Sequence, residues 1–171
     1  HSASSAASDV YKRQTMGSGI AHALARSGSA VTLIESGDEA LDRARRRMTD
    51  LYEAAVQRGL IEAEVATAEQ DTIRFQTGYD GVEDSGLVIE AVFEDMKTKQ
   101  DVMKALDLAA PDAVLASNTS YLDIDLMAAC LADPSRLVGL HFFSPAHIMK
   151  LLEIVRGAAT SDRSLATGYA L

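Results

Sequence analysis

The hydrophobic positions follow two periodicities along the chain, one typical of helices and one typical of buried strands. Apolar side chains that recur every three or four residues predict helices over residues 15–27, 38–58, 96–109 and 123–131. Short apolar or β-branched runs predict strands over 30–36, 72–75, 87–93, 113–117 and 136–143. A further helix is expected to begin at Ser161, which is a suitable N-cap.

This alternation of strands and helices is typical of an α/β protein with a doubly wound, mainly parallel sheet, so we expect a Rossmann-like fold. Ligands bind such a sheet at the carboxyl ends of its strands. Candidate site residues should therefore lie at the expected strand ends, which are Glu35, Glu90–Glu94, Ser117–Ser120 and His141–Ser144.

The composition narrows the class of protein. A chain of 171 residues, 47% of them hydrophobic and 24% charged, can form one domain with a sizeable core. The formal charge of −9 argues against broad nucleic-acid binding and against attachment to anionic membranes. The single cysteine, Cys130, excludes an internal disulfide framework and fits a reducing compartment. No apolar run reaches membrane-spanning length.

The stretch MGSGIA, residues 16–21, places two glycines at the entry of the first expected helix. In a dinucleotide-binding turn such glycines let the backbone approach a pyrophosphate, and the helix dipole favours the anion. A helix entry of small residues without a ligand has the same pattern. Glu35 favours the first interpretation, because a carboxylate there can bind both ribose hydroxyls and repel a 2′-phosphate, selecting NAD over NADP. A solvated strand-end glutamate is the alternative.

Three polar residues are candidates for chemistry. Ser120 follows a strand but lacks a G-x-S-x-G elbow, so hydrogen bonding or capping is the more modest role beside that of a nucleophile. His141 ends an apolar strand, and an imidazole can exchange protons near neutral pH. Glu153 lies in the apolar run LLEIV, where a buried carboxylate needs a partner. A His141–Glu153 pair is the natural proposal; a chance glutamate and a satisfied core histidine are the alternative.

The other histidines and a cluster of arginines have less specific interpretations. His22 and His147 are expected to have surface or packing roles, and the histidine spacing matches no zinc site. The arginine-rich stretch RARRR, residues 43–47, is expected to form a solvated helix face. Contact between one of these arginines and a substrate phosphate is the alternative.

Together, four stretches resemble the NAD-binding domain of 3-hydroxyacyl-CoA dehydrogenases, and most closely the dehydrogenase part of multifunctional fatty-acid β-oxidation proteins. They occur in the family's order between Thr15 and Leu171. The stretches are TMGSGIAHALARSGSAVTLIE, VIEAVFEDMKTKQ, LASNTSYLDID and GLHFFSPAHIMKLLEIVRGAATSD. The resemblance implies oxidation of (3S)-3-hydroxyacyl-CoA to 3-ketoacyl-CoA, with NAD as the cofactor and acyl-CoA as the substrate.

The resemblance also implies roles for individual residues. His141 matches the catalytic base, Glu153 the carboxylate paired with it, and Ser120 the serine that hydrogen-bonds the reacting oxygen and helps to place the nicotinamide. Ser144 stands where the family has a Ser or Asn beside the substrate. The positions that match cofactor-binding residues, besides Ser120, are Met16, Gly17, Gly19, Glu35, Glu94 and Lys99. No metal is implied.

Departures from the family pattern shape the expected domain organisation. Lys12 and Gln14 stand where the first glycines of the family turn G-x-G-T-M-G-x-G-I-A belong. We expect residues 1–14 to be a non-native segment in place of the first strand. Residues 15–171 are then an NAD-binding domain truncated before a helical C-terminal domain, and the isolated chain should bind NAD weakly and be inactive. The alternative is a non-catalytic Rossmann-fold relative with a degenerate cofactor turn.

The resemblance extends to the parent protein and its surroundings. It implies a homo-oligomer or a member of a β-oxidation complex, with no nucleic-acid partner. It further implies a cytoplasmic location in a bacterium, or a mitochondrial or peroxisomal location in a eukaryote.

Overall fold

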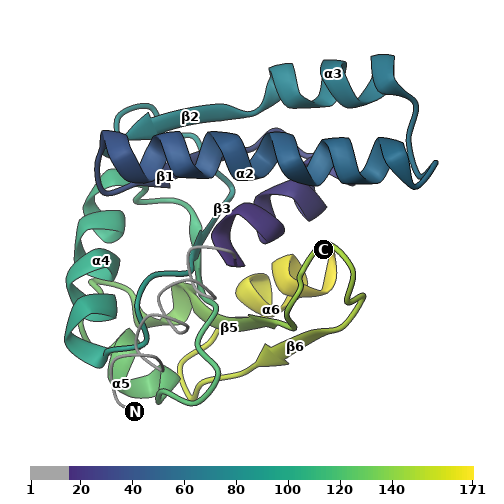
Figure 1. Ribbon diagram of the computed structural model, residues 1–171. Helices are drawn as coiled ribbons and strands as arrows, with labels where there is room; N and C mark the ends of the chain where they lie inside the picture. Colours follow the sequence, from purple (N-terminus) through teal and green to yellow (C-terminus); the bar gives the residue numbers. More distant parts are fainter. Residues whose placement is uncertain (1–15) are drawn as a thin grey trace, which may run out of the picture. The chain divides into compact units, whose positions relative to one another are not determined.

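The computed structural model describes residues 16–171, which divide into two compact units (Figure 1). Within this range the first unit comprises residues 16–78 and 144–149, and the second comprises 79–143 and 150–171. Residues 1–15, with Lys12, Gln14 and the place of the expected first strand, lie outside the described residues. The expectation of a non-native segment there stays a prediction.

The first unit is a two-stranded sheet covered by helices. Residues 16–26 are helical and are followed by β1 (Thr32–Glu35), α2 (Asp38–Gln57), α3 (Ala63–Thr72) and β2 (Arg74–Thr77). The two strands are parallel, with Leu33 opposite Phe75. The long helix α2 lies along both strands, and α3 lies beside it (Figure 1). The buried residues of this core are Ala21, Ala25, Leu33, Ala44, Met48, Tyr52, Ala66 and Ile73.

The structure confirms most of the elements expected in the first unit. The first helix agrees over its described residues, and it ends before Gly28, whose φ of 88° is the left-handed conformation of a C-cap glycine. The strand expected over residues 72–75 was misplaced, because Thr72 is the last residue of α3 and β2 begins at Arg74. The hydrophobic pattern did not predict helix α3, because this helix buries only Ala66 and therefore lacks an apolar stripe.

The second unit contains a four-stranded sheet in the order β3-β4-β5-β6. Its strands are β3 (Leu87–Glu90), β4 (Val114–Ser117), β5 (Leu137–Phe142) and β6 (Leu152–Val155). The first three are parallel, and β6 is antiparallel to β5. Its helices are α4 (Met96–Ala109), α5 (Ile124–Ala128), the 3₁₀ helix η1 (Pro134–Arg136) and α6 (Asp162–Tyr169). As expected, Ser161 caps α6, accepting a hydrogen bond from the backbone N of Ser164 at 3.2 Å.

The middle of the second sheet is buried on both faces, which explains its nearly continuous apolar sequence. All four residues of β4 are buried. Val114, Ala116, Val138 and Leu140 form one cluster, and Leu165 of α6 packs against it. Helix α4 contacts β3 and β4 and buries Met103 and Leu106.

The observed strand orders confirm an α/β fold with mainly parallel sheets. The doubly wound order is 3-2-1-4-5-6, in which the strand that comes first in the sequence separates strands 2 and 4. The observed pairings β2-β1 and β3-β4-β5 correspond to 3-2 and 4-5-6 of that order. The described residues therefore form two sheets where one was expected.

Candidate active site

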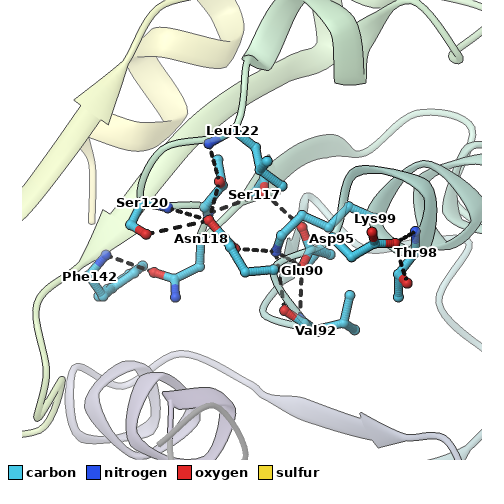
Figure 2. A network of polar contacts seen from close by, with 12 residues as sticks. Glu90, Val92, Asp95, Thr98, Lys99, Ser117, Asn118, Ser120, Leu122 and Phe142 are labelled. Carbon is cyan, nitrogen blue, oxygen red and sulfur yellow. Dashed lines mark hydrogen bonds and ion pairs between the residues drawn. The ribbon is translucent and has the colours of Figure 1, made fainter. Parts of the chain in front are cut away.

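Polar side chains of the second unit gather at the carboxyl ends of β3 and β4 (Figure 2). Glu90 ends β3 and Ser117 ends β4, and the register places these two residues opposite each other. The hydroxyl of Ser117 donates a hydrogen bond of 2.7 Å to Glu90 Oε2. The strand expected over residues 87–93 ends early, at Glu90, where Oε1 of this residue accepts a hydrogen bond from the backbone N of Val92.

A buried ion cluster joins this end of β3 to α4. The ammonium of Lys99 lies 2.5 Å from Glu90 Oε1 and 3.2 Å from Glu94 Oε2, and it donates to the carbonyl of Val92 at 3.2 Å. The side chains of Lys99 and Glu90 are 1% and 0% exposed. Since an ammonium has three N–H donors, these three contacts occupy all of them.

Glu94 connects the ion cluster to the loop that carries Ser120. Its Oε1 accepts hydrogen bonds from the Thr119 hydroxyl at 2.5 Å and from the backbone N of Ser120 at 2.8 Å. Burial would raise the pKa of Glu94, but the hydrogen bonds from Thr119 and Ser120 and the charge of Lys99 lower it below its ordinary value. The carboxylate is thus held ionised as an acceptor, and Ser120 itself is exposed.

His141 and Glu153 form the pair expected from the sequence. They lie directly opposite each other in the antiparallel ladder between β5 and β6, and His141 Nδ1 is 3.1 Å from Glu153 Oε2. An ionised carboxylate can only accept a hydrogen bond, so the proton of this contact belongs to Nδ1. The lone pair of a neutral imidazole is then on Nε2, which can accept a proton.

The sequence argument for this pair had a wrong premise. The side chain of Glu153 is 59% exposed, whereas an apolar run had suggested burial. Alternation explains the difference: Leu152 and Ile154 pack against the core cluster, and Glu153 between them has its side chain on the opposite face of β6. His141 is the more buried partner, at 21% exposed, and its ring lies 4.8 Å from that of Phe143.

In the first unit, the described part of the glycine-containing turn enters the helix over residues 16–26. Met16 and Gly17 are partly buried, and a Cβ at Gly17 would meet no described atom within 4 Å. Gly19 is buried, and a Cβ there would lie 3.5 Å from Cβ of Ala146. Among residues 16–171, no atom would obstruct a ligand that approaches Gly17 closely.

Glu35 ends β1 and is half-buried. It lines a shallow surface hollow together with Ala40, Arg43, Ala44 and Arg47 of α2. Burial raises the pKa of Glu35, and the charges of Arg43 and Arg47 oppose that rise. A carboxylate at this strand end has the acceptor oxygens needed to bind both hydroxyls of a ribose.

The remaining expected residues have less specific surroundings. Ser144 is exposed and belongs to the segment 144–149 of the first unit. His22 is buried against Tyr52, with ring centroids 4.6 Å apart, so it has a packing role as expected. Over residues 16–171, no group of histidine, cysteine and carboxylate side chains is arranged to hold a metal ion. No helix in that range is both long and apolar enough to cross a membrane.

The structure gives partners to residues that the sequence analysis placed at strand ends without an individual role. Glu90 is the buried partner of Lys99, Thr119 bonds Glu94, and Asn118 Oδ1 accepts a hydrogen bond from the backbone N of Phe142 at 2.8 Å. The available signal was their position at strand ends, since Glu90 and the stretch SNTS both follow apolar runs. Their partners depend on which strands are neighbours, which the local pattern does not contain.

Comparisons with known proteins show the family to which the chain is related. The family model described as 3-hydroxyacyl-CoA dehydrogenase, NAD binding domain, matches residues 14–171. The chain is 39% identical over 158 residues to the peroxisomal bifunctional enzyme of Danio rerio, covering 92% of this chain and 21% of that protein. It is 39% identical over 153 residues to 3-hydroxybutyryl-CoA dehydrogenase of Mycobacterium tuberculosis, covering 88% and 54%.

Solved structures show the same likeness. The crystal structure of (S)-3-hydroxybutyryl-CoA dehydrogenase from Ralstonia eutropha matches with a TM-score of 0.86 and 32% identity. The match covers 91% of this chain and 56% of that one. This chain therefore spans about half of the single-function relatives and about a fifth of the bifunctional one.

Proposed function

Because the chain belongs to the family of the NAD-binding domain of 3-hydroxyacyl-CoA dehydrogenases, we propose that it carries the cofactor site and the catalytic base of such an enzyme. The reaction is the oxidation of (3S)-3-hydroxyacyl-CoA to 3-ketoacyl-CoA with reduction of NAD⁺. The observation that carries the proposal is the His141–Glu153 pair, in which a carboxylate holds an imidazole with Nε2 available as a base.

In this proposal His141 removes the proton of the substrate's C3 hydroxyl through Nε2. The cofactor, which Met16, Gly17, Gly19 and Glu35 are proposed to hold, would supply a hydride acceptor for the hydrogen and electron pair of the C3–H bond. The substrate thereby becomes a ketone, and the hydroxyl proton stays on the imidazole. Glu153, 3.1 Å from Nδ1, orients the ring and stabilises the charge that it acquires.

Ser120 is proposed to donate a hydrogen bond to the reacting oxygen and to help place the nicotinamide. Its backbone is held by Glu94, whose carboxylate accepts the Ser120 N–H at 2.8 Å. Lys99 has all its donors engaged within the chain, so we assign it a positioning role that acts through Glu94. Glu94 remains the residue of this group that is proposed to lie next to the cofactor.

The proposed NAD-binding residues of the first unit are Met16, Gly17, Gly19 and Glu35. Gly17, beside which no described atom would meet a Cβ, is the proposed point of close approach for a pyrophosphate, and Glu35 is the proposed acceptor for the ribose hydroxyls. A carboxylate at this place repels a 2′-phosphate, which is why NAD is proposed in preference to NADP.

Further properties of the whole protein are proposed on the family relationship. Ser144 is a proposed contact of the acyl-CoA substrate, and the parent protein is proposed to act as an oligomer or within a β-oxidation assembly, in the cytoplasm of a bacterium. Residues 15–171 are proposed to be one NAD-binding domain. The alternative, a non-catalytic relative, depends on Lys12 and Gln14 and gives no purpose to the His141–Glu153 pair.

The test is NADH formation from (3S)-3-hydroxybutyryl-CoA by the full-length protein, followed by the absorbance of NADH. Substituting His141→Ala should lower the turnover by about 10²- to 10⁴-fold, the usual contribution of a general base. Binding of NADH, measured by its fluorescence, should change little. Unchanged turnover in this variant would exclude the catalytic role of His141. Absence of NADH formation by the unsubstituted protein would exclude the activity.

A further inference from the structure

Strand β5 extends beyond the point at which its neighbour β4 ends. The ladder between β4 and β5 stops where Ser117 lies opposite Gly139. On its other edge β5 continues to pair with β6, through His141 opposite Glu153 and up to Phe142. The part of β5 that carries His141 is therefore supported by a backbone ladder on one edge, among the strands of the described chain.

On the edge of β5 that faces β4, the side chain of Asn118 provides a hydrogen-bond acceptor beyond the end of the β4 ladder. Its Oδ1 accepts a hydrogen bond from the backbone N of Phe142 at 2.8 Å, as Figure 2 shows. Its own backbone N donates a hydrogen bond of 2.8 Å to the carbonyl of Glu90. One residue thus links the ends of β3 and β5, and it lies two positions before Ser120.

We propose that Asn118 is a positioning residue for the base: its amide oxygen fixes the end of β5 and so holds the His141 ring in register with Glu153. The inference rests on the proposed function, because the residues it positions are the candidate base and the loop of Ser120. The hydroxyl of Thr119 and the backbone N of Ser120 are both bonded to Glu94. Asn118 therefore supplies the contact from this loop to β5.

The physical argument concerns the Phe142 N–H, which is partly buried. Without the oxygen of Asn118 this donor loses its partner, and a buried unsatisfied N–H is costly. The end of β5 can lower that cost by moving toward water. The imidazole of His141 would move with it, and the contact of 3.1 Å between Nδ1 and Glu153 would lose its fixed geometry.

The experiment is solution NMR of the chain, whose four histidines make the imidazole signals simple to assign. In the unsubstituted chain, the neutral His141 ring should carry its proton on Nδ1. In Asn118→Leu, the Phe142 amide should exchange about tenfold faster, the factor that corresponds to 1.4 kcal/mol. The His141 ring should become a mixture with the Nε2–H tautomer, the form preferred by imidazole in water.

Two further variants separate positioning from general loosening. Asn118→Asp keeps an acceptor oxygen, so the Phe142 amide should stay protected and the Nδ1–H tautomer should persist. Thr160→Val removes a hydrogen bond of 2.8 Å to the Leu137 carbonyl, at the other end of β5. It should lower the stability of the chain and leave the His141 tautomer unchanged.

The proposal is overturned if Asn118→Leu leaves both signals unchanged, or if Thr160→Val shifts the tautomer as much as Asn118→Leu does. Should Asn118→Leu not fold, the Asp variant decides, because loss of the Phe142 protection or of the Nδ1–H tautomer in spite of the retained oxygen overturns the proposal. None of these signals depends on NADH formation. Failure of the inference is therefore distinguishable from failure of the proposed activity.

Discussion

The buried ion cluster at the end of β3 allows one sharp prediction about stability. The ammonium of Lys99 contacts Glu90 at 2.5 Å and Glu94 at 3.2 Å, and the three side chains are between 0% and 9% exposed. Substituting Lys99→Met keeps most of the volume and the unbranched stem of the side chain. It removes the charge and all three hydrogen-bond donors, so Glu90 is left as a buried carboxylate without its cation.

The expected loss follows from the burial of both partners. Removing one member of a buried ion pair typically costs about 3–5 kcal/mol, because the remaining charge is desolvated and uncompensated. Glu90 keeps its hydrogen bonds from Ser117 and Val92, at 2.7 Å each, which is why the loss should not exceed this range. Small domains are stable by about 5–15 kcal/mol, so Lys99→Met should remove a third or more of the total.

Lys97, two residues earlier on the same helix, provides a matched control. Its ammonium also lies 2.5 Å from a carboxylate, that of Asp101, but the two side chains are 83% and 54% exposed. Exposed ion pairs contribute little, so Lys97→Met should leave the stability nearly unchanged. The double variant Glu90→Gln with Lys99→Met should be more stable than Lys99→Met alone, because it removes the uncompensated charge.

The assay is equilibrium unfolding in urea, followed by circular dichroism at neutral pH. The free energy of unfolding is obtained for each variant, and its slope against urea concentration is compared with that of the unsubstituted chain. A changed slope indicates a different unfolded or native state. If Lys99→Met and Lys97→Met lower the free energy of unfolding equally, the reasoning is refuted. Burial would then make no difference between two ion pairs of the same length. A double variant less stable than Lys99→Met would refute the account of Glu90.

Three further predictions concern stability. Burial and nearby positive charges lower the pKa of His22 to about 4, so the unfolded state, near 6.5, takes up the proton first and stability should fall as the pH drops from about 6.5 to 4. His22→Phe should flatten that slope in urea midpoints, and an unchanged slope would contradict the assignment. Gly139→Ala would bring a Cβ to 2.7 Å from Val155 Cβ, so the free energy of unfolding should fall by about 1–3 kcal/mol; an unaltered midpoint would show that β6 shifts freely. Arg136→Met removes a 2.7 Å contact to Asp107 and bonds to two buried carbonyls, for an expected loss of about 3–5 kcal/mol in thermal or urea unfolding, and a loss below 1 kcal/mol would argue against this network.

Local hydrophobic patterns predicted the fold class and most of the helices and strands. Helix α4 coincides with the expected range 96–109, and α2 ends one residue before the expected end. Helix α3 was missed because its single buried residue, Ala66, gives no periodic signal. The end of β3 was placed too late because the apolar run continues past Glu90, whereas the strand ends at Glu90, whose side chain bonds the backbone N of Val92.

Some features of the candidate site were likewise predictable from the sequence, and others were not. The pairing of His141 with Glu153 was expected from residue types, and the structure supplies its cause, which is a ladder register that places the two residues opposite each other. Lys99 was expected, from the resemblance, to be a residue near the cofactor, and the structure shows that its ammonium contacts Glu90. The position of Asn118 in a strand-end loop was visible in the sequence, and its contact with Phe142 was not.

By itself, the sequence determined the alternation of helices and strands, the family, and the residue types at the strand ends, because periodicity and motif spacing are local properties of the chain. Only the tertiary structure decided which of those side chains meet. Strand order and register bring together residues far apart in the chain, such as Ser117 with Glu90. Burial then decides whether a charged side chain stabilises the fold or remains available for chemistry. That is why Lys99 is a buried partner of Glu90 while Lys97, two residues away, is a solvated surface charge.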